Sequence, residues 1–339
     1  MACLLSVIIP THKRPRMLAR AIDSALKSER GGNVQVVVVP NGPDDSWRDV
    51  ARAFETDARV CWHYLACGNA SAARNHGLRY AEGKYVRFLD DDDFLYAEAA
   101  QQLEEMVKRK VDVCSAPLEN LTPDGRAISV FRLPDSSDVV TAALMSIAIT
   151  GLTQGSIFRR EVVCRVRWRE DAELYDDYLW MLDVVVGRDL SWHKLMVPVG
   201  SYVQHEGLRL SRRRRTLVNS KQLVSAVIAV YDDLLARGAL SPERSSAVAT
   251  SLLTHAHSAF PACPVYLSLW IVRARQICFT ATPLQPVFLR YPILGRALLL
   301  LEWGVLLPRT FSRARRSLMW LVGRYCSEWR DANKLKNRL

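Results

Sequence analysis

Short apolar runs alternate with amphipathic segments through the first 90 residues of the chain. Residues 4–10 (LLSVIIP) and 34–39 (VQVVVV) are apolar runs that end at a proline or directly before one. Runs of this kind are typical of strands buried on both faces. Between them, apolar residues recur at helical spacing within residues 16–27. The pattern predicts a β-α-β unit, and therefore a parallel sheet.

The same spacing rules predict the remaining elements as far as residue 260. Further strands are expected at residues 60–65, 84–89, 111–117 and 156–158, and further helices at 47–54, 70–81, 96–108, 139–147, 177–186, 217–237 and 241–260. The last of these starts with Ser-Pro-Glu, which fits the preferences of a helix start. Residues 119–137 are expected to be a loop. We predict an α/β domain at residues 1–211 and a helical, basic region at residues 212–339.

Polar residues follow three of the predicted strands and form a candidate site. Pro10 and Thr11 end the first strand, Asn41 follows the second, and the aspartates 90–93 follow the strand at 84–89. In a doubly wound sheet, ligands bind beyond the carboxyl ends of the strands. We therefore expect these residues, including Asp90 and Asp91, to surround one crevice.

The four consecutive aspartates 90–93 are a candidate metal site. Four adjacent carboxylates repel one another, and their pKa values rise unless a cation neutralises them. Carboxylate oxygens suit Mg²⁺ or Mn²⁺ when substrate phosphates complete the coordination shell. The alternative is that Asp92 or Asp93 caps the helix at 96–108 while the others are solvated. The run alone leaves both interpretations open.

Three further positions carry candidate chemistry. Asp176 and Asp177 stand where an apolar helix begins, and a carboxylate there can accept a proton from an attacking hydroxyl or can cap the helix and complement its dipole. Arg74, on the helix at 70–81, can pair with a phosphate or a nucleobase, or can lie solvated on the helix surface. His205 is a lone histidine that is either structural or a metal ligand.

The net charge of +11 is unevenly distributed over the 339 residues. From residue 206 onward there are 21 Lys and Arg against 7 Asp and Glu, which gives +14 and leaves −3 for residues 1–205. A basic region rich in Trp and Leu suits an anionic surface such as a membrane leaflet. The basic residues belong to no recognisable nucleic-acid-binding module, so we expect no nucleic-acid partner.

Cysteine usage and the distribution of apolar residues bear on location. The eight cysteines are scattered and contain no CxxC pair, which indicates reduced thiols in a cytoplasmic protein.

The start of the chain lacks the basic region of a signal peptide, and no stretch has the roughly 18 to 20 apolar residues of a membrane span. Residues 265–280, 287–307 and 311–329 mix Leu, Ile, Trp and Phe with Arg, as interfacial helices do. We predict peripheral association with the inner face of the membrane; the alternative is packing on the rest of the protein or on a partner subunit.

The order of these features resembles the family 2 glycosyltransferases over about residues 4–211. SVIIPTHKR (6–14) resembles the first strand and donor-binding turn of the family, and GNASAARNHGLRYAEGKYVRFLDDDD (68–93) resembles its Asn-Gly-Arg-Asn helix and Asp-x-Asp strand. GSIFRRE (155–161) resembles the segment that lines the acceptor side, and YDDYLWML (175–182) is similar to the Glu-Asp helix start. The resemblance implies the A-type glycosyltransferase fold, a Rossmann-like, mostly parallel sheet flanked by helices.

The resemblance also implies roles for individual residues. The donor would be bound by Pro10, Thr11, Arg14, Asn41, Arg74, Asp90 and Asp91, a Mn²⁺ or Mg²⁺ ion by Asp92 and His205, and the acceptor proton would be taken by Asp177. Asp90 would contact the ribose, and Asp176 stands where the family usually has Glu. The turn Pro-Asn-Gly-Pro at 40–43 departs from the Asp-Asp-Gly-Ser type of the family. The side-chain amide of Asn41 would then replace a carboxylate contact to the base. UDP is therefore expected as the donor nucleotide only because the family usually uses it.

The activity implied is transfer of a sugar, with inversion, from a nucleotide-sugar donor to a hydroxyl of a glycan or lipid-linked acceptor. Synthesis of cell-surface polysaccharide or glycolipid is the expected setting. The missing acidic turn and the basic C-terminal region suggest an alternative. In that alternative, the chain is a catalytically silent member of the family that serves as a membrane-associated scaffold or a glycan-binding protein.

Overall fold

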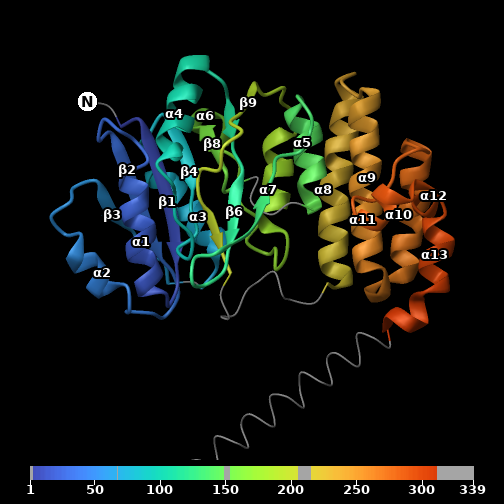
Figure 1. The fold of residues 1–339 in the computed structure, drawn as a ribbon, viewed down its shortest axis with the longest axis horizontal. Helices are drawn as coiled ribbons and strands as arrows, with labels where there is room; N and C mark the ends of the chain where they lie inside the picture. Colours follow the sequence, from blue (N-terminus) through green and yellow to red (C-terminus); the bar gives the residue numbers. More distant parts are fainter. Residues whose placement is uncertain (1–2, 67, 149–152, 205–214, 311–339) are drawn as a thin grey trace, which may run out of the picture.

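The structure is a computed structural model that describes residues 3–66, 68–148, 153–204 and 215–310 (Figure 1). Its strands are β1 (Leu5–Thr11), β2 (Val34–Pro40), β3 (Val60–Trp62), β4 (Tyr85–Phe88), β5 (Val113–Ser115), β6 (Leu118–Leu121), β7 (Ala127–Phe131), β8 (Ser156–Arg159), β9 (Trp192–Lys194) and β10 (Ser201–Val203). The helices of the α/β part are α1 (Pro15–Leu26), α2 (Arg48–Ala53), α3 (Ala70–Tyr80), α4 (Glu98–Arg109), α5 (Val139–Met145), α6 (Arg160–Val163) and α7 (Asp176–Val185). The C-terminal helices are α8 (Leu217–Ala236), α9 (Pro242–Ala259), α10 (Pro264–Ile277), α11 (Pro286–Arg290), α12 (Pro292–Arg296) and α13 (Leu298–Gly304), and short 3-10 turns lie at Ser146–Ala148 and Phe260–Ala262.

The central sheet has seven strands in the order β3-β2-β1-β4-β8-β5-β9. The neighbours β3, β2, β1 and β4 are parallel, β8 is antiparallel to both β4 and β5, and β9 is parallel to β5. A second sheet has the order β10-β6-β7. The prediction of a mostly parallel sheet flanked by helices is therefore confirmed.

Each face of the central sheet has its own hydrophobic core. Along β1, Val7 and Ile9 face α1 and α4, whereas Ile8 faces the side of α3 and α7. This alternation is what a strand buried on both faces produces. The core on the α7 side continues without a break into α8, α9 and α10. Figure 1 shows the resulting order, with the sheet at one end, α7 and α5 beside it, and the C-terminal helices beyond.

Two glycines let the chain approach β1 closely enough to fix the elements that lead to the aspartate run. A Cβ at Gly77 on α3 would lie 2.6 Å from Cγ2 of Ile8, so this helix can pack on the sheet only with glycine there. A Cβ at Gly83 would lie 2.5 Å from the backbone nitrogen of Ser6. Both contacts are far shorter than van der Waals distance, and a larger residue would push α3 and the start of β4 away from β1.

Two of the sequence predictions for local structure are wrong. The expected loop at 119–137 contains most of the hairpin β6–β7, whose β7 side chains are mostly exposed. The segment 287–307 is not one helix but the three short helices α11, α12 and α13. Pro292 explains the first break, because proline disfavours helical geometry in the residue before it, and Tyr291 has φ −130° and ψ 77°.

The C-terminal helices pack on the α/β part rather than standing apart from it. Tyr178 on α7 bonds Ser251 on α9 through their hydroxyls at 2.7 Å, inside the shared core. The alternative of packing on the rest of the protein is observed for one side of the segments 265–280 and 287–307, where Leu267, Ile271, Phe288 and Leu298 join the shared core. The predicted boundary at 211/212 and the tail segment 311–329 lie outside the described residues, so the division into two domains stays a prediction. Among the described helices, not one combines the length and apolarity needed to cross a bilayer.

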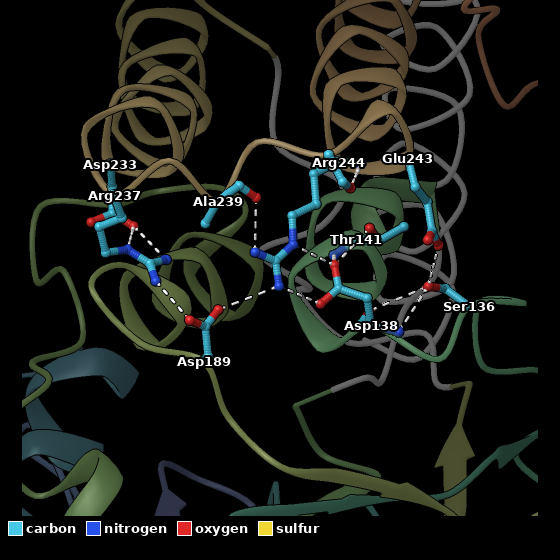
Figure 2. Close-up of polar contacts among 10 residues, drawn as sticks. Ser136, Asp138, Thr141, Asp189, Asp233, Arg237, Ala239, Glu243 and Arg244 are labelled. Carbon is cyan, nitrogen blue, oxygen red and sulfur yellow. Dashed lines mark hydrogen bonds and ion pairs between the residues drawn. The ribbon is translucent and has the colours of Figure 1, made fainter.

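An ion-pair network at the start of α9 fastens this helix to the α/β part (Figure 2). The Arg244 guanidinium donates to both oxygens of Asp138 at 3.0 and 2.8 Å and to the Ala239 carbonyl at 3.0 Å, and it lies 3.4 Å from Asp189. Asp138 also accepts from the backbone of Thr141 and so caps α5. Burial opposes ionisation of Asp138, but the bonds from Arg244 and Thr141 outweigh it and lower the pKa of this carboxyl.

We expect Arg244→Gln to lower the free energy of unfolding by about 2 kcal/mol, the scale of a charge-assisted hydrogen bond whose partner is left partly buried. Urea unfolding of the full chain measures this loss. Arg48→Gln is the matched control, because Arg48 pairs with Asp45 on the surface, with 61% and 77% of the side chains exposed. Exposed pairs contribute little. Equal losses in the two variants would contradict the assignment of Arg244 as a fastening residue.

Candidate active site

The aspartate run begins one residue after the end of β4, and its members have different hydrogen-bond partners. Asp91 is turned inward and accepts hydrogen bonds from the Thr11 hydroxyl at 2.7 Å, the His12 backbone at 3.2 Å and the Arg14 guanidinium at 2.8 Å. Burial raises the pKa of Asp91 to about 6, against the lowering effect of Arg14. Because both of its oxygens are engaged, Asp91 ties the loop after β1 to the end of β4.

The other three aspartates form a compact acidic group. Asp90, Asp92 and Asp93 each offer a carboxylate oxygen, and these oxygens lie within 4.8 Å of one another. Asp93 accepts from the Val203 backbone at 2.7 Å, and Asp92 lies 3.1 Å from an Arg14 nitrogen. Clustered carboxylate oxygens of this kind suit a hard divalent cation such as Mg²⁺ or Mn²⁺.

Helix capping by Asp92 or Asp93 is ruled out by the position of the next helix. That helix is α4, whose N-cap is Ala97, with no side-chain bond to its first turn. The chain needs four more residues after Asp93 to reach this helix. The alternative that Asp92 or Asp93 caps this helix is therefore wrong, and Asp93 belongs with Asp90 and Asp92.

Arg74 joins the acidic group to the start of α7. Its guanidinium lies 2.7 Å from an oxygen of Asp90 and 2.8 Å from an oxygen of Asp176, and it stacks 4.4 Å above the ring of Trp168. Only 8% of the side chain is exposed, so the interpretation as a solvated surface arginine is wrong. Burial works against the charge, but the two carboxylates raise the pKa of Arg74 above its ordinary value. The arginine is therefore a fixed cation between two acidic groups.

Asp177 combines partial burial with a neighbouring like charge. Burial, followed by the charge of Asp176, raises the pKa of Asp177 to about 6, while the Tyr178 backbone bond at 2.8 Å and Arg74 oppose the rise. Tyr175, with φ 63°, is the N-cap of α7, so neither aspartate caps the helix. Both lie in its first turn, where the helix dipole favours their charge. A carboxylate with a pKa near neutrality is suited to accept a proton.

The turn after β2 uses its amide internally. Asn41 donates to the Thr11 carbonyl both from its backbone at 3.0 Å and from its side chain at 2.9 Å, and its own carbonyl contacts His12 at 2.6 Å. An acid stands three residues further on, since Asp44 accepts from the Lys13 backbone at 2.7 Å. Pro10, Thr11 and Asn41 thus meet at the ends of β1 and β2, as expected from the parallel strands.

The part of the chain that contains the aspartate run matches a known protein family. Residues 6–135 match the model of the family described as glycosyl transferase family 2. These residues belong to glycosyl transferase family 2. The family domain therefore holds β1 to β4, Arg74 and the whole aspartate run, while Asp176 and Asp177 lie beyond the matched residues.

Curated relatives match part of the chain at modest identity. An uncharacterized glycosyltransferase of Rickettsia bellii is 26% identical over 179 residues, which is 52% of this chain and 25% of that protein. The uncharacterized glycosyltransferase EpsJ of Bacillus subtilis is 29% identical over 125 residues, or 36% of each chain. The match thus spans only about a quarter to a third of the length of these relatives.

Solved structures extend the similarity to the fold of most of the chain. The crystal structure of residues 1–349 of S. aureus TarS superposes with a TM-score of 0.61 at 14% identity, covering 81% of this chain and 82% of that one. The same region of TarS in complex with UDP-GlcNAc gives a TM-score of 0.59. At this identity the likeness shows the fold alone, and it confirms the A-type glycosyltransferase fold.

Several residues that complete this site were missed by the sequence analysis. Gln154 donates to the second oxygen of Asp90. Asn75 holds the segment before α7, since its amide bonds Trp168 and Glu170 at 2.9 Å each. Asn75 follows Arg74 in the same motif and could have been chosen, whereas no pattern marks Gln154. His205, a predicted metal ligand, lies outside the described residues.

Proposed function

We propose that this protein transfers a sugar from a nucleotide-sugar donor to an acceptor hydroxyl with inversion of the anomeric configuration. The single observation that carries the proposal is the Arg74 bridge. It connects Asp90, in the acidic group at the end of β4, with Asp176, next to a carboxyl whose pKa is raised to about 6. A cation-binding group and a candidate base beside one another are what sugar transfer to a hydroxyl requires.

Asp92, with Asp90 and Asp93, would hold a Mn²⁺ or Mg²⁺ ion, and His205 is proposed as a further ligand. The close approach of three carboxylate oxygens supports the fit. When bound, such an ion neutralises charge on a diphosphate. Arg14, near Asp91 and Asp92, and the loop at Pro10, Thr11 and Asn41 are proposed to bind the nucleotide.

In the proposed reaction, Asp177 accepts the proton of the acceptor hydroxyl. The acceptor oxygen then forms a bond to the anomeric carbon on the face opposite the diphosphate, and the bond from that carbon to the diphosphate oxygen breaks. The electron pair of the broken bond leaves with the nucleoside diphosphate. Displacement from the opposite face is what inverts the configuration.

A UDP-sugar is the proposed donor, and a glycan or a lipid-linked acceptor in cell-surface polysaccharide or glycolipid synthesis is the proposed partner. The TarS structure with UDP-GlcNAc supports the donor class only through its fold. We also propose a cytoplasmic location at the inner face of the membrane. Six described cysteines without a disulfide support that compartment.

The experiment is a thermal-shift screen of nucleotide sugars with and without Mn²⁺. A ligand present at 100 times its dissociation constant stabilises the folded state by about 2.7 kcal/mol, so binding raises the melting temperature measurably. We expect at least one UDP-sugar to raise it in a Mn²⁺-dependent manner. Asp92→Asn should abolish the Mn²⁺-dependent part, because it removes one carboxylate of the acidic group.

Asp124→Asn is the matched control, because this aspartate lies in the exposed turn between β6 and β7 and forms an ion pair with Arg126, away from the acidic group. It should leave the shift unchanged. No Mn²⁺-dependent shift with any nucleotide sugar, or an unchanged shift in Asp92→Asn, would overturn the proposed donor site. Donor binding without transfer to any acceptor would favour the alternative of a catalytically silent scaffold or glycan-binding protein.

A further inference from the structure

The helices after α9 expose an unusual number of large apolar side chains. On α10, Val265, Leu269 and Val272 lie at positions i, i+4 and i+7 with exposed fractions of 68%, 66% and 47%. The opposite side of the same helix is buried through Leu267 and Ile271. The inward side already packs on the core, so this outer row is a second apolar face that has no packing role among the residues that the structure describes.

The following short helices continue this character. Leu289, Ile293 and Leu300 are exposed by 59%, 74% and 79%, and Leu307, which follows the end of α13, is exposed by 69%. On α13 the exposed Leu300 and Trp303, at positions i and i+3, share one side of the helix. The indole of Trp303 donates to the Ser268 hydroxyl at 3.0 Å, which joins α13 to α10. We call the exposed apolar residues of α10 to α13 the outer face; these helices form the end of the molecule farthest from β3 (Figure 1).

The charge of this region has a single sign on the outside. Residues 264–310 contain five arginines and one acid, Glu302. Glu302 is fully buried, and its two oxygens contact His257 and Arg309. The only negative charge of the segment is thus withdrawn into the interior. Arg273, Arg290 and Arg296 remain exposed among the apolar side chains.

Charge complementarity selects the occupant of the outer face. A second copy of the chain would bring this cationic face against itself in a two-fold dimer, and like charges would meet. Residues 311–339, with eight Lys and Arg against two acids, carry the same sign. A bilayer with anionic headgroups offers both partners at once, because apolar side chains enter the acyl boundary while arginines reach the phosphates.

We propose that the outer face is a membrane-binding surface for anionic lipid bilayers. The proposal rests on the proposed location at the inner face of the membrane but not on the sugar transfer. Each exposed cation near an anionic leaflet contributes about 1 kcal/mol, and 1.4 kcal/mol is a factor of ten. Three exposed arginines therefore predict a preference of roughly 100-fold for anionic over neutral vesicles at low salt.

The experiment is flotation of the full chain with vesicles of phosphatidylcholine alone or with about 30% of the anionic lipid phosphatidylglycerol. We expect recovery with the anionic vesicles only, weakened by salt. Leu269→Glu with Leu300→Glu should reduce binding at least about tenfold, because two buried apolar contacts are lost and two repelling charges are added.

The matched control carries the same two charges on the α/β part, as Ile128→Glu with Met196→Glu, at residues exposed by 53% and 75%. It should bind as the unchanged chain does. Absence of binding to anionic vesicles at low salt, or an equal loss in the control, would overturn the proposal. So would sedimentation showing a dimer that Leu269→Glu with Leu300→Glu converts to monomer. The thermal shift with nucleotide sugars is measured without vesicles, so failure of one proposal is distinguishable from failure of the other.

Discussion

Replacing Asp177 with Asn should lower turnover by about 100-fold or more while the donor still binds. The amide keeps the size of the side chain but cannot accept the acceptor proton, and general-base catalysis contributes typically 10²–10⁴-fold. Steady-state kinetics and the Mn²⁺-dependent thermal shift, measured on the same preparation, separate the two effects. Undiminished turnover would remove Asp177 from the mechanism.

The pH profile of the unchanged chain supplies an independent check on Asp177. Burial and Asp176 raise the pKa of Asp177 to about 6, and only the ionised form can accept a proton. We expect kcat/KM to rise with pH through about 6 and to level off above it. This rise of kcat/KM through about pH 6, the acidic limb of the profile, should be absent from any residual activity of Asp177→Asn.

Asp177→Asn should raise the folding stability at neutral pH although it lowers the activity. A carboxyl whose pKa is raised in the folded state binds its proton more tightly there than in the unfolded chain, so it lowers stability as pH rises from about 4 to 6. Asp177→Asn removes this destabilising effect at neutral pH and should not unfold the protein. Asp183→Asn, on the same helix but paired with Arg169, is the control that should retain turnover.

The sequence was sufficient for the parts of the fold that follow local rules. Buried parallel strands are continuous apolar runs, and β1 and β2 were predicted to within one or two residues for that reason. The start of α9 was equally predictable from the sequence, because Ser241 is the N-cap of the helix and Pro242 is in its first turn. The hairpin in 119–137 was missed because its outer strand, β7, carries exposed residues and lacks an alternating pattern.

The candidate site was predictable in position but not in its connections. The end of β4 is fixed by strand topology, so Asp90 and its neighbours could be placed at the rim in advance. Whether Arg74 is solvated or bridges two carboxylates depends on Asp176, 102 residues further along the chain. The bond between Tyr178 and Ser251 likewise spans 73 residues. No local pattern encodes such pairs, because they form only when the elements pack.

Arg74→Gln should have the largest effect on folding among single changes at the site. The arginine is 8% exposed and pairs with Asp90 and Asp176, which are 26% and 21% exposed. Removing one partner of a largely buried pair leaves uncompensated charge and costs about 3 to 5 kcal/mol, and here one cation serves two carboxylates. Urea unfolding at pH 7 measures the loss.

Two further measurements separate the bridging role of Arg74 from a loss of packing. Arg74 lowers the pKa of Asp177, so without its charge the limb in the pH profile should move to higher pH; Arg74→Lys, which keeps the charge, should restore most of that position. Arg169→Gln breaks a comparable pair, to Asp183, away from the acidic group and should cost less without moving the limb. A limb that stays in place in Arg74→Gln, or moves equally in Arg169→Gln, would show that the cation between the acidic group and α7 does not govern the proton acceptor.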